Sequence, residues 1–181
     1  MATNSLIQGE FHQSRTQFTL FFDTLIEILQ EADDSKYYYT WRSEKEGQKV
    51  EAYRSGTLYP TSAIALKYAK IDVLSCQSEH IPHPVSIATY PNSQIIYQNE
   101  AHKILFGKEL DLYATYQTQN WRYLFLKRLK EQSPQIEQPS VRLNSDRLPV
   151  VGIDKGLIID LGEELVTIEE FLVHEKHRYR C

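Results

Sequence analysis

Cys76, His80 and His83, near the middle of the chain, have the side-chain types and spacing of a metal site. Thiolate and imidazole are ordinary zinc ligands, and either histidine could also ligate haem. A closed zinc site needs a fourth ligand, and Glu79 is the nearest candidate. The alternative is that both histidines belong to a proline-rich linker, HIPHP, over residues 80–84. The linker is the favoured interpretation, and the metal site is kept as a hypothesis.

The segment 120–132 also carries groups that could bind a partner. Its apolar residues recur with the period of an amphipathic helix, and its predicted outer face carries four cations: Arg122, Lys127, Arg128 and Lys130. Such a face could contact nucleic acid or an acidic partner. A net charge of −4 disfavours binding that rests on neutralising phosphates. A solvated helix face is therefore favoured, and a nucleic-acid accessory role is an alternative.

The common catalytic signatures do not occur in the sequence. There is no G-x-S-x-G motif, no P-loop, no dinucleotide-binding fingerprint and no H-E-x-x-H motif. The adjacent acids Glu169 and Glu170 would point to opposite faces of a strand, so they could not share one site. The sequence therefore favours a non-enzymatic role and names no cofactor. A metal-dependent enzyme built on Cys76, His80 and His83 is the alternative function.

Composition indicates a globular protein. The chain has 181 residues, of which 41% are hydrophobic, and this length can bury a sizeable core. Two cysteines do not make a disulfide framework, which predicts a reducing, cytoplasmic location. The N-terminal residues lack the pattern of a secretory signal, and no apolar run approaches the ~20 residues that span a bilayer. We therefore expect no membrane partner.

The segment 16–32 has apolar residues at helical spacing, so an amphipathic helix is predicted there. One interpretation is that this helix packs on the core of its own domain. The other is that it forms a dimer or partner interface, because its apolar face is wider than one groove needs. In that case the contact residues would be Phe18, Phe21, Phe22 and Leu25.

The remainder of the first half has a hairpin pattern followed by a helical one. Residues 36–42 and 50–53 have strand composition and flank Gly47. Residues 61–75 favour a helix with Thr61 or Ser62 at its start. The proline-rich run at 80–84 cannot hold regular structure. We therefore divide the chain into an N-terminal helical and hairpin extension, 1–84, and a second domain, 85–181.

The second half begins with two predicted strands, 85–90 and 94–98, joined by a turn at Pro91. Asn99 is placed to cap a short helix that ends at Gly107. The predicted inner face of this helix is Ala101, Ile104 and Leu105, and His102 lies opposite. After the helix at 120–132 come four strand-like segments separated by turn residues: 140–143, 148–153, 157–161 and 165–173. This pattern is typical of an α+β protein with an antiparallel sheet.

Residues 85–173 resemble a PAS domain in the order of their predicted elements. The local match is Ile95–Gly107, IIYQNEAHKILFG, which is similar to the second strand and first helix of that family. Asn99, Ala101, Leu105 and Gly107 stand at the matching places. The sequence departs from the family in two respects. It offers four C-terminal strand-like segments where the family has three, and its middle region lacks the usual glycine-rich spacing.

The resemblance implies an antiparallel sheet with helices on one face and a small interior cavity. Members of the family are commonly sensory or dimerisation modules, and many bind a flavin, haem or small metabolite. Trp121 and Phe125 are the residues expected to line the cavity. His102 is expected to face solvent, and in such a cavity it could instead be turned inward as a third lining residue. The chain is therefore expected to be a regulatory or interaction module that binds a protein partner or a second copy, with a small molecule as a further partner.

Overall fold

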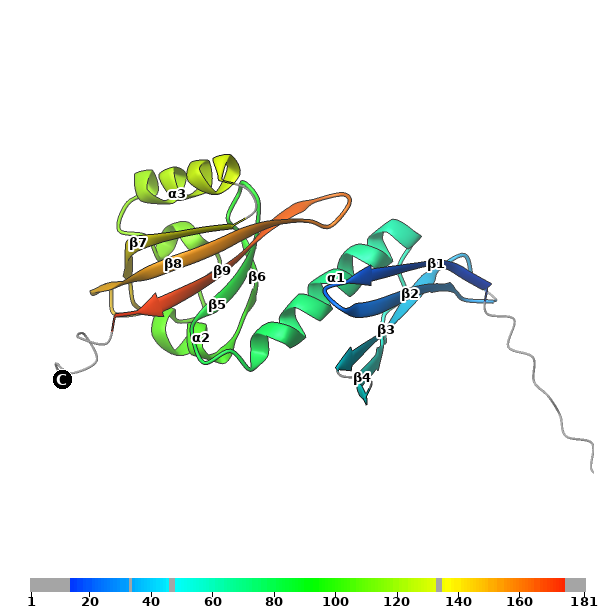
Figure 1. Cartoon of the computed structure of the whole chain (residues 1–181). Helices are drawn as coiled ribbons and strands as arrows, with labels where there is room; N and C mark the ends of the chain where they lie inside the picture. Colours follow the sequence, from blue (N-terminus) through cyan, green and yellow to red (C-terminus); the bar gives the residue numbers. More distant parts are fainter. Residues whose placement is uncertain (1–13, 33, 46–47, 133–134, 175–181) are drawn as a thin grey trace, which may run out of the picture. The chain divides into compact units, whose positions relative to one another are not determined.

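The computed structural model describes residues 14–32, 34–45, 48–132 and 135–174. The chain divides into two compact units, Met1–Lys70 and Ile71–Cys181. Each unit contains one antiparallel sheet, and the described residues include three α-helices (Figure 1). The predicted α+β class is confirmed. The division lies inside the first helix, ahead of the boundary that the sequence predicts after Pro84.

The first unit has four strands in sequence order: β1 (Ser14–Phe21), β2 (Thr24–Gln30), β3 (Tyr37–Lys45) and β4 (Gln48–Arg54). The predicted hairpin of β3 and β4 is confirmed, and Gly47 lies outside the described residues. The predicted helix over 16–32 is wrong, because this segment forms the β1–β2 hairpin (Figure 1).

A two-residue turn connects β1 to β2. Phe22 and Asp23 both have positive φ, 45° and 58°, as a two-residue hairpin turn requires. In β2, burial alternates, since Thr24, Ile26 and Ile28 are buried while the residues between them are partly exposed. Apolar residues on both faces of a hairpin produced a spacing that resembles a helix, which explains the wrong prediction.

Aromatic rings form the core of the first unit. Trp41 stacks on Tyr53 with ring centroids 5.7 Å apart, and Tyr39 stacks on Tyr59 at 5.7 Å. Tyr59 in turn stacks on Tyr68 of helix α1 (Ser62–Glu79) at 5.1 Å. The first residues of α1 therefore pack on the inner face of the sheet, as the predicted helix start at Thr61 or Ser62 allows.

The second unit has five strands in the order β6-β5-β9-β8-β7, all antiparallel. Their bounds are β5 (Val85–Thr89), β6 (Ile95–Gln98), β7 (Gln135–Leu143), β8 (Pro149–Asp160) and β9 (Leu165–Val173). The last three form a meander at the C-terminal end of the described chain (Figure 1).

The expected turn between 148–153 and 157–161 does not form, because both segments belong to β8. Asp154 points into the interior and pairs there with Arg142. Gly156 lies under Phe125, whose ring tip would be 2.7 Å from a Cβ at this position. Residues that are typical of a turn are thus retained in a strand for reasons of tertiary packing, and three C-terminal strands result.

The helices of the second unit are α2 (Glu100–Phe106), the single turn η1 (Leu112–Ala114) and α3 (Gln119–Glu131). Phe106 of α2 contacts Phe171 of β9, and Phe125 of α3 lies over Gly156 of β8. Gly156 is paired with Glu169, two residues from Phe171, so α2 and α3 pack on the same face of the sheet.

The predicted cap of α2 is confirmed in detail. The Asn99 side-chain oxygen accepts from the backbone N–H groups of His102 and Val85, both at 2.9 Å. Its amide nitrogen donates to the carbonyl oxygens of Ser78, Ile81 and His83. Gly107, with φ of 77°, follows the helix. Asn99 thus caps α2 and also holds the chain between α1 and β5.

Candidate functional site

The interior of the second unit contains four charged side chains: Arg122 of α3, Arg142 of β7, Asp154 of β8 and Glu169 of β9. Each is no more than 1% exposed. Arginine and carboxylate side chains are almost never fully buried unless they are paired. This buried ionic network is therefore the most unusual chemistry among the described residues, and we take it as the candidate site.

Arg122 extends from α3 to the centre of the sheet. Its Nη1 atom donates to both carboxylate oxygens of Glu169, at 2.6 and 2.8 Å. Its Nε atom donates to the Ser93 hydroxyl at 2.9 Å. Ser93 is fully buried and lies in the turn before β6. Arg122 therefore joins α3 to the central strand β9 and to the β5–β6 connection.

Arg142 binds the same carboxylate from the other side. Its Nη2 atom lies 2.9 Å from Glu169 Oε2 and 2.7 Å from Asp154 Oδ1. The Tyr116 hydroxyl donates to Asp154 Oδ2 at 3.0 Å and accepts from Arg142 at 3.3 Å. Two cations and two anions thus balance in charge, and Glu169 is shared by both arginines.

Aromatic faces surround the two guanidinium groups. Arg142 Cζ lies 4.8 Å from the ring centre of Tyr116, 5.3 Å from Phe171 and 5.6 Å from Phe106. Arg122 Cζ lies 5.5 Å from the Phe125 ring. Such contacts favour a planar cation that has lost its water. The rings therefore compensate part of the desolvation cost of burying two arginines.

Burial and pairing act in opposite directions on the two arginines. Burial alone lowers the pKa of each arginine. The charge of Glu169 outweighs this effect for Arg122 and raises its pKa above the usual value. For Arg142 the same is done by Asp154, Tyr116 and Glu169. Burial also raises the pKa of Tyr116 well above its ordinary range. Both arginines therefore stay charged and Tyr116 stays a neutral hydroxyl donor at physiological pH.

His102 lies at the edge of the network and is buried. Burial, followed by the nearby positive charge of Arg142, lowers its pKa to about 3, so the ring is neutral. The Gln98 amide nitrogen lies 3.0 Å from His102 Nδ1 and also donates to the Gly107 carbonyl. Nδ1 is thus the acceptor, which places the ring proton on Nε2.

In the interior of the second unit, three N–H groups have no hydrogen-bond partner within the described part of the chain: Arg122 Nη2, Arg142 Nε and His102 Nε2. Each belongs to a side chain no more than 1% exposed. A buried donor without an acceptor costs roughly 1–3 kcal/mol. The network is therefore complete in charge but retains free donors that an acceptor oxygen could occupy.

The structure separates the three residues expected to line the interior. Phe125 and His102 are buried, whereas Trp121 is 40% exposed and lies on the outer side of α3. The helix is rotated relative to the prediction, because Arg122 occupies the inward position next to Trp121. His102 is likewise turned inward, and Ile104, predicted to be inward, is exposed.

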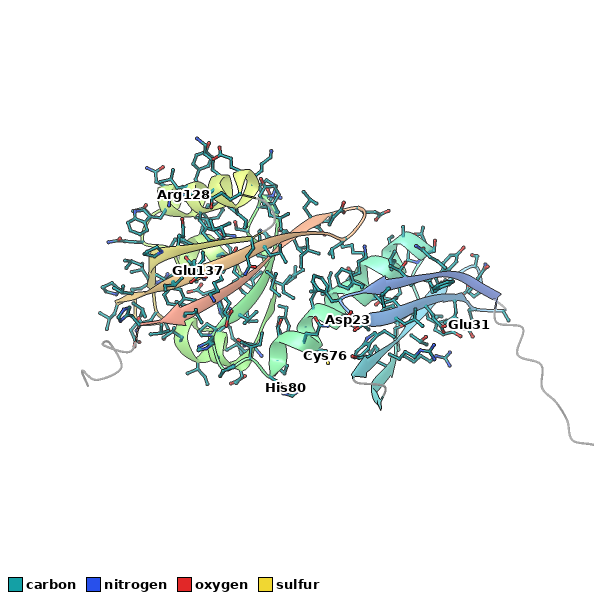
Figure 2. The ribbon with its side chains drawn as sticks, viewed as in Figure 1. Asp23, Glu31, Cys76, His80, Arg128 and Glu137 are labelled. Carbon is teal, nitrogen blue, oxygen red and sulfur yellow. The ribbon has the colours of Figure 1, made fainter. Side chains whose placement is uncertain are left out.

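The predicted cationic face of α3 is corrected at one position. Arg122 points inward, while Lys127, Arg128 and Lys130 are exposed. Arg128, which is labelled on α3 in Figure 2, donates to the Gln138 side chain at 2.8 Å. A pattern that assigns every arginine to the solvent side cannot detect an arginine whose partner is a distant buried glutamate.

Cys76, His80 and His83 are not brought together as a metal site. Within the described ranges, no group of three or more His, Cys, Asp or Glu residues could hold a metal ion. Cys76 lies on α1, and His80 follows the helix end (Figure 2). His83 contributes its backbone carbonyl to Asn99. The Asn99 side chain therefore binds the backbone of this stretch at Ser78, Ile81 and His83.

The four predicted interface residues lie on two faces of the first sheet. Phe18 and Leu25 point to its outer face, and Phe18 is 63% exposed. Phe21 is stacked edge-on against Phe22 at the hairpin and lies under Lys70 of α1. The helix that was to present them together is absent. Whether they contact a partner stays a prediction.

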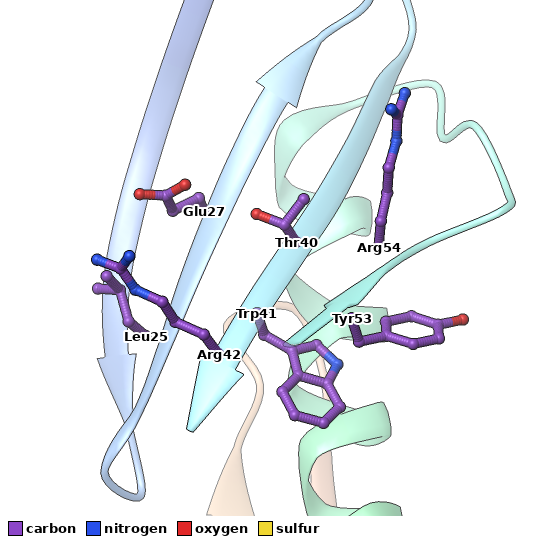
Figure 3. Close-up of a pocket in the computed structure, with 7 residues that line it drawn as sticks. All are labelled: Leu25, Glu27, Thr40, Trp41, Arg42, Tyr53 and Arg54. Atoms are coloured by element: carbon purple, nitrogen blue, oxygen red, sulfur yellow. The ribbon is translucent and has the colours of Figure 1, made fainter. Parts of the chain in front are cut away.

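A pocket of about 350 Å³ lies on the first sheet (Figure 3). The cross-strand pairs Leu25–Arg42, Glu27–Thr40 and Thr40–Arg54 place five of its lining residues on one face. Figure 3 shows Trp41 and Tyr53 directed away from these side chains. The pocket is lined by two guanidinium groups and one carboxylate. The ionic network remains the candidate site, because it holds two guanidinium groups and two carboxylates that are all buried.

Sequence reasoning missed Arg142, Asp154 and Glu169 as site residues. A weak signal exists for Glu169, which lies two residues before the buried Phe171 and therefore on the same face of β9. That spacing predicts a carboxylate on the buried face, and a buried carboxylate demands a partner.

No α-helix in the described part of the chain is long and apolar enough to cross a membrane. Comparison with models of known protein families and with curated proteins finds no match to this chain.

Proposed function

We propose that residues 85–173 form a PAS-like regulatory module and that the chain acts by binding. The order of elements in the second unit carries this proposal. Two strands, a short capped helix, a helical turn, a longer helix and three strands follow one another, as the resemblance implies. The fourth C-terminal segment, which departed from the family pattern, is absorbed into β8.

The ionic network supports a switching role for α3. Arg122 is a buried charged group through which α3 joins the sheet, and its partner Glu169 is shared with Arg142 of β7. A ligand or partner that binds one arrangement of α3 more tightly would shift the population toward that arrangement. The change would reach β7, β8 and β9 together because their charged groups share partners.

The free interior donors support a small polar ligand as one input. Arg122 Nη2, Arg142 Nε and His102 Nε2 all present hydrogen atoms. A molecule with carbonyl or carboxylate oxygens matches them, since such oxygens accept hydrogen bonds from arginine and neutral imidazole. The ligand class we propose is therefore a small oxygen-rich metabolite.

Native mass spectrometry of the purified full chain tests this function, because it reports subunit number and retained small molecules together. We expect a dimer, a retained organic molecule or both. A bare monomer across the concentration range, whose melting temperature no carboxylate or carbonyl metabolite raises, would contradict the regulatory role.

Arg128→Met serves as a control for the ligand measurement, because Arg128 is exposed on α3 and should leave ligand retention unchanged. His102→Asn, which removes one free donor but keeps a side-chain group near Gln98, should reduce it. Equal retention by both variants would place the ligand elsewhere.

A further inference from the structure

The strongest unassigned surface is an apolar groove of about 590 Å³ beside α2, named here the α2 groove. Its less exposed lining includes Ala101, Leu105, Val150 and Val173. Leu105 and Val173 pack against the core cluster of Phe106, Val150 and Phe171, so the groove has a firm base. The lining residues carry no formal charge, and Asn144 is the polar one among them.

Two large apolar side chains at the groove are strongly exposed. Ile104 is 74% exposed and Leu148 is 60% exposed, although both line the groove. Single exposed apolar residues are ordinary on protein surfaces. Two of them beside an apolar groove form a continuous patch, which is typical of a surface that another molecule covers.

The surface of α2 is complementary to itself. Ala101 lies one turn before Ile104 on the same side of the helix, so a small residue stands next to a large exposed one. If a second copy packs antiparallel on this helix, Ile104 of each copy meets Ala101 and the groove of the other. Such reciprocity is the condition for a two-fold interface.

The charges on α2 have the same symmetry. Glu100 is exposed and Lys103 is partly exposed, and their charged groups lie 3.7 Å apart within one chain. An antiparallel second copy would place each Glu100 opposite the other copy's Lys103, giving two pairs of opposite charge. A strongly acidic or strongly basic partner would be repelled by one of the two residues, so the charges favour a second copy of the chain.

We propose that the α2 groove is the contact surface of a two-fold dimer, in which Ile104 of each copy enters the groove of the other. The proposal rests on the binding role proposed above and names the partner and the surface. It is independent of the β1–β2 residues that the sequence suggested as an interface.

Sedimentation velocity of the full chain over a range of concentrations tests this surface. Ile104→Asp buries two carboxylates against apolar walls in each dimer, so it should raise the dimer Kd by about 100-fold or more. Ile104 is mostly exposed in the single chain, so the variant should keep the wild-type circular dichroism and melting temperature. Leu110→Asp is the matched control, because Leu110 is 84% exposed and does not line the groove.

A charge exchange tests the two-fold geometry. Glu100→Lys alone places like charges opposite each other, as does Lys103→Glu alone, and each should raise the dimer Kd by about tenfold at low salt. An equimolar mixture of these two variants should form heterodimers near the wild-type Kd, because opposite charges then face each other again.

A dimer that persists in Ile104→Asp, or a mixture that fails to restore association, would overturn the α2 surface and leave the binding role intact. A wild-type monomer that retains an organic molecule would do the same. A wild-type monomer that retains nothing and responds to no metabolite would contradict both proposals.

Discussion

In the first unit the inner face of the sheet is lined by rings, whereas in the second unit it carries charges. Trp41, Tyr53, Tyr39 and Tyr59 stack in the first unit, where the buried polar side chains among the described residues are Thr24 and Ser55. The second unit buries the charged side chains of Arg122, Arg142, Asp154 and Glu169.

The two interiors are expected to differ in how much stability each loses when a side chain is substituted. Ring stacking depends on shape and area, and it loses energy gradually when one member is altered. A buried ionic network depends on each partner, since the loss of one leaves an uncompensated charge in a low-dielectric interior. We therefore expect the second unit to be the more specific and the less tolerant of substitution.

The largest expected effect is that of Glu169→Gln. The variant keeps the shape but removes the charge that two buried arginines share, so we expect a loss of about 3–5 kcal/mol in the free energy of unfolding. Urea denaturation measures it. Glu170→Gln, next in sequence and on the opposite face of β9, should change stability by no more than about 0.5 kcal/mol. If Glu169→Gln and Glu170→Gln lost equal free energy of unfolding, the buried ionic network would not be the feature that sets the second unit apart.

The acid sensitivity of the second unit should depend on His102. The unfolded chain takes up this proton near the ordinary pKa of 6.5, and the folded chain does so only near 3. The contribution of neutral His102 to the free energy of unfolding is therefore fully present above pH 6.5. It is lost as the pH falls toward 3, by up to about 1.4 kcal/mol per pH unit.

Urea denaturation of wild type and His102→Asn at several pH values measures this contribution. The difference between the two proteins should be largest near neutral pH and shrink on acidification. A constant difference across this pH range would show that His102 is protonated equally in both states.

Substitution of one glycine in each unit tests how closely the surrounding atoms are packed. A Cβ at Gly152 of β8 would lie 2.5 Å from the Leu172 carbonyl oxygen and 2.6 Å from the Phe171 ring. Gly152→Ala should therefore cost about 1–3 kcal/mol. At Gly56 of the first unit, no atom of the described residues lies within 4 Å of such a Cβ. Thermal unfolding should show little change for Gly56→Ala, and a comparable loss there would contradict the difference in tolerance.

The smallest expected effect on stability is that of substituting Tyr53, whose ring stacks on Trp41 in the first unit. Tyr53→Phe retains the stacking on Trp41, so stability should stay within about 0.5 kcal/mol of wild type. Tyr53→Ala removes a ring that is 44% exposed and should cost about 1 kcal/mol more. A loss of several kcal/mol in Tyr53→Phe would show that the first unit also depends on a specific polar contact.

Local chemistry determined the stretch from Val85 to Gly107. The turn at Pro91, the strand before Asn99, the cap of α2 and the glycine after it involve residues close in sequence, and they form as predicted. The starts of α1 and α3 follow for the same reason, since Thr61 and Thr118 accept hydrogen bonds from residues three positions on. Caps and turns are short-range interactions, so the sequence alone is sufficient for them.

Tertiary contacts decided the rest. Phe22 and Asp23 have no glycine or asparagine to mark a hairpin, and the pairing of β2 with β1 on one side and β3 on the other places them in the left-handed region. Arg122 lies 47 residues from Glu169, and Arg142 lies 27 residues from it. Residues so far apart show no common pattern in sequence, and a charged side chain is expected in water unless its partner is known. Only the folded sheet brings the partners close enough to offset the cost of burying them.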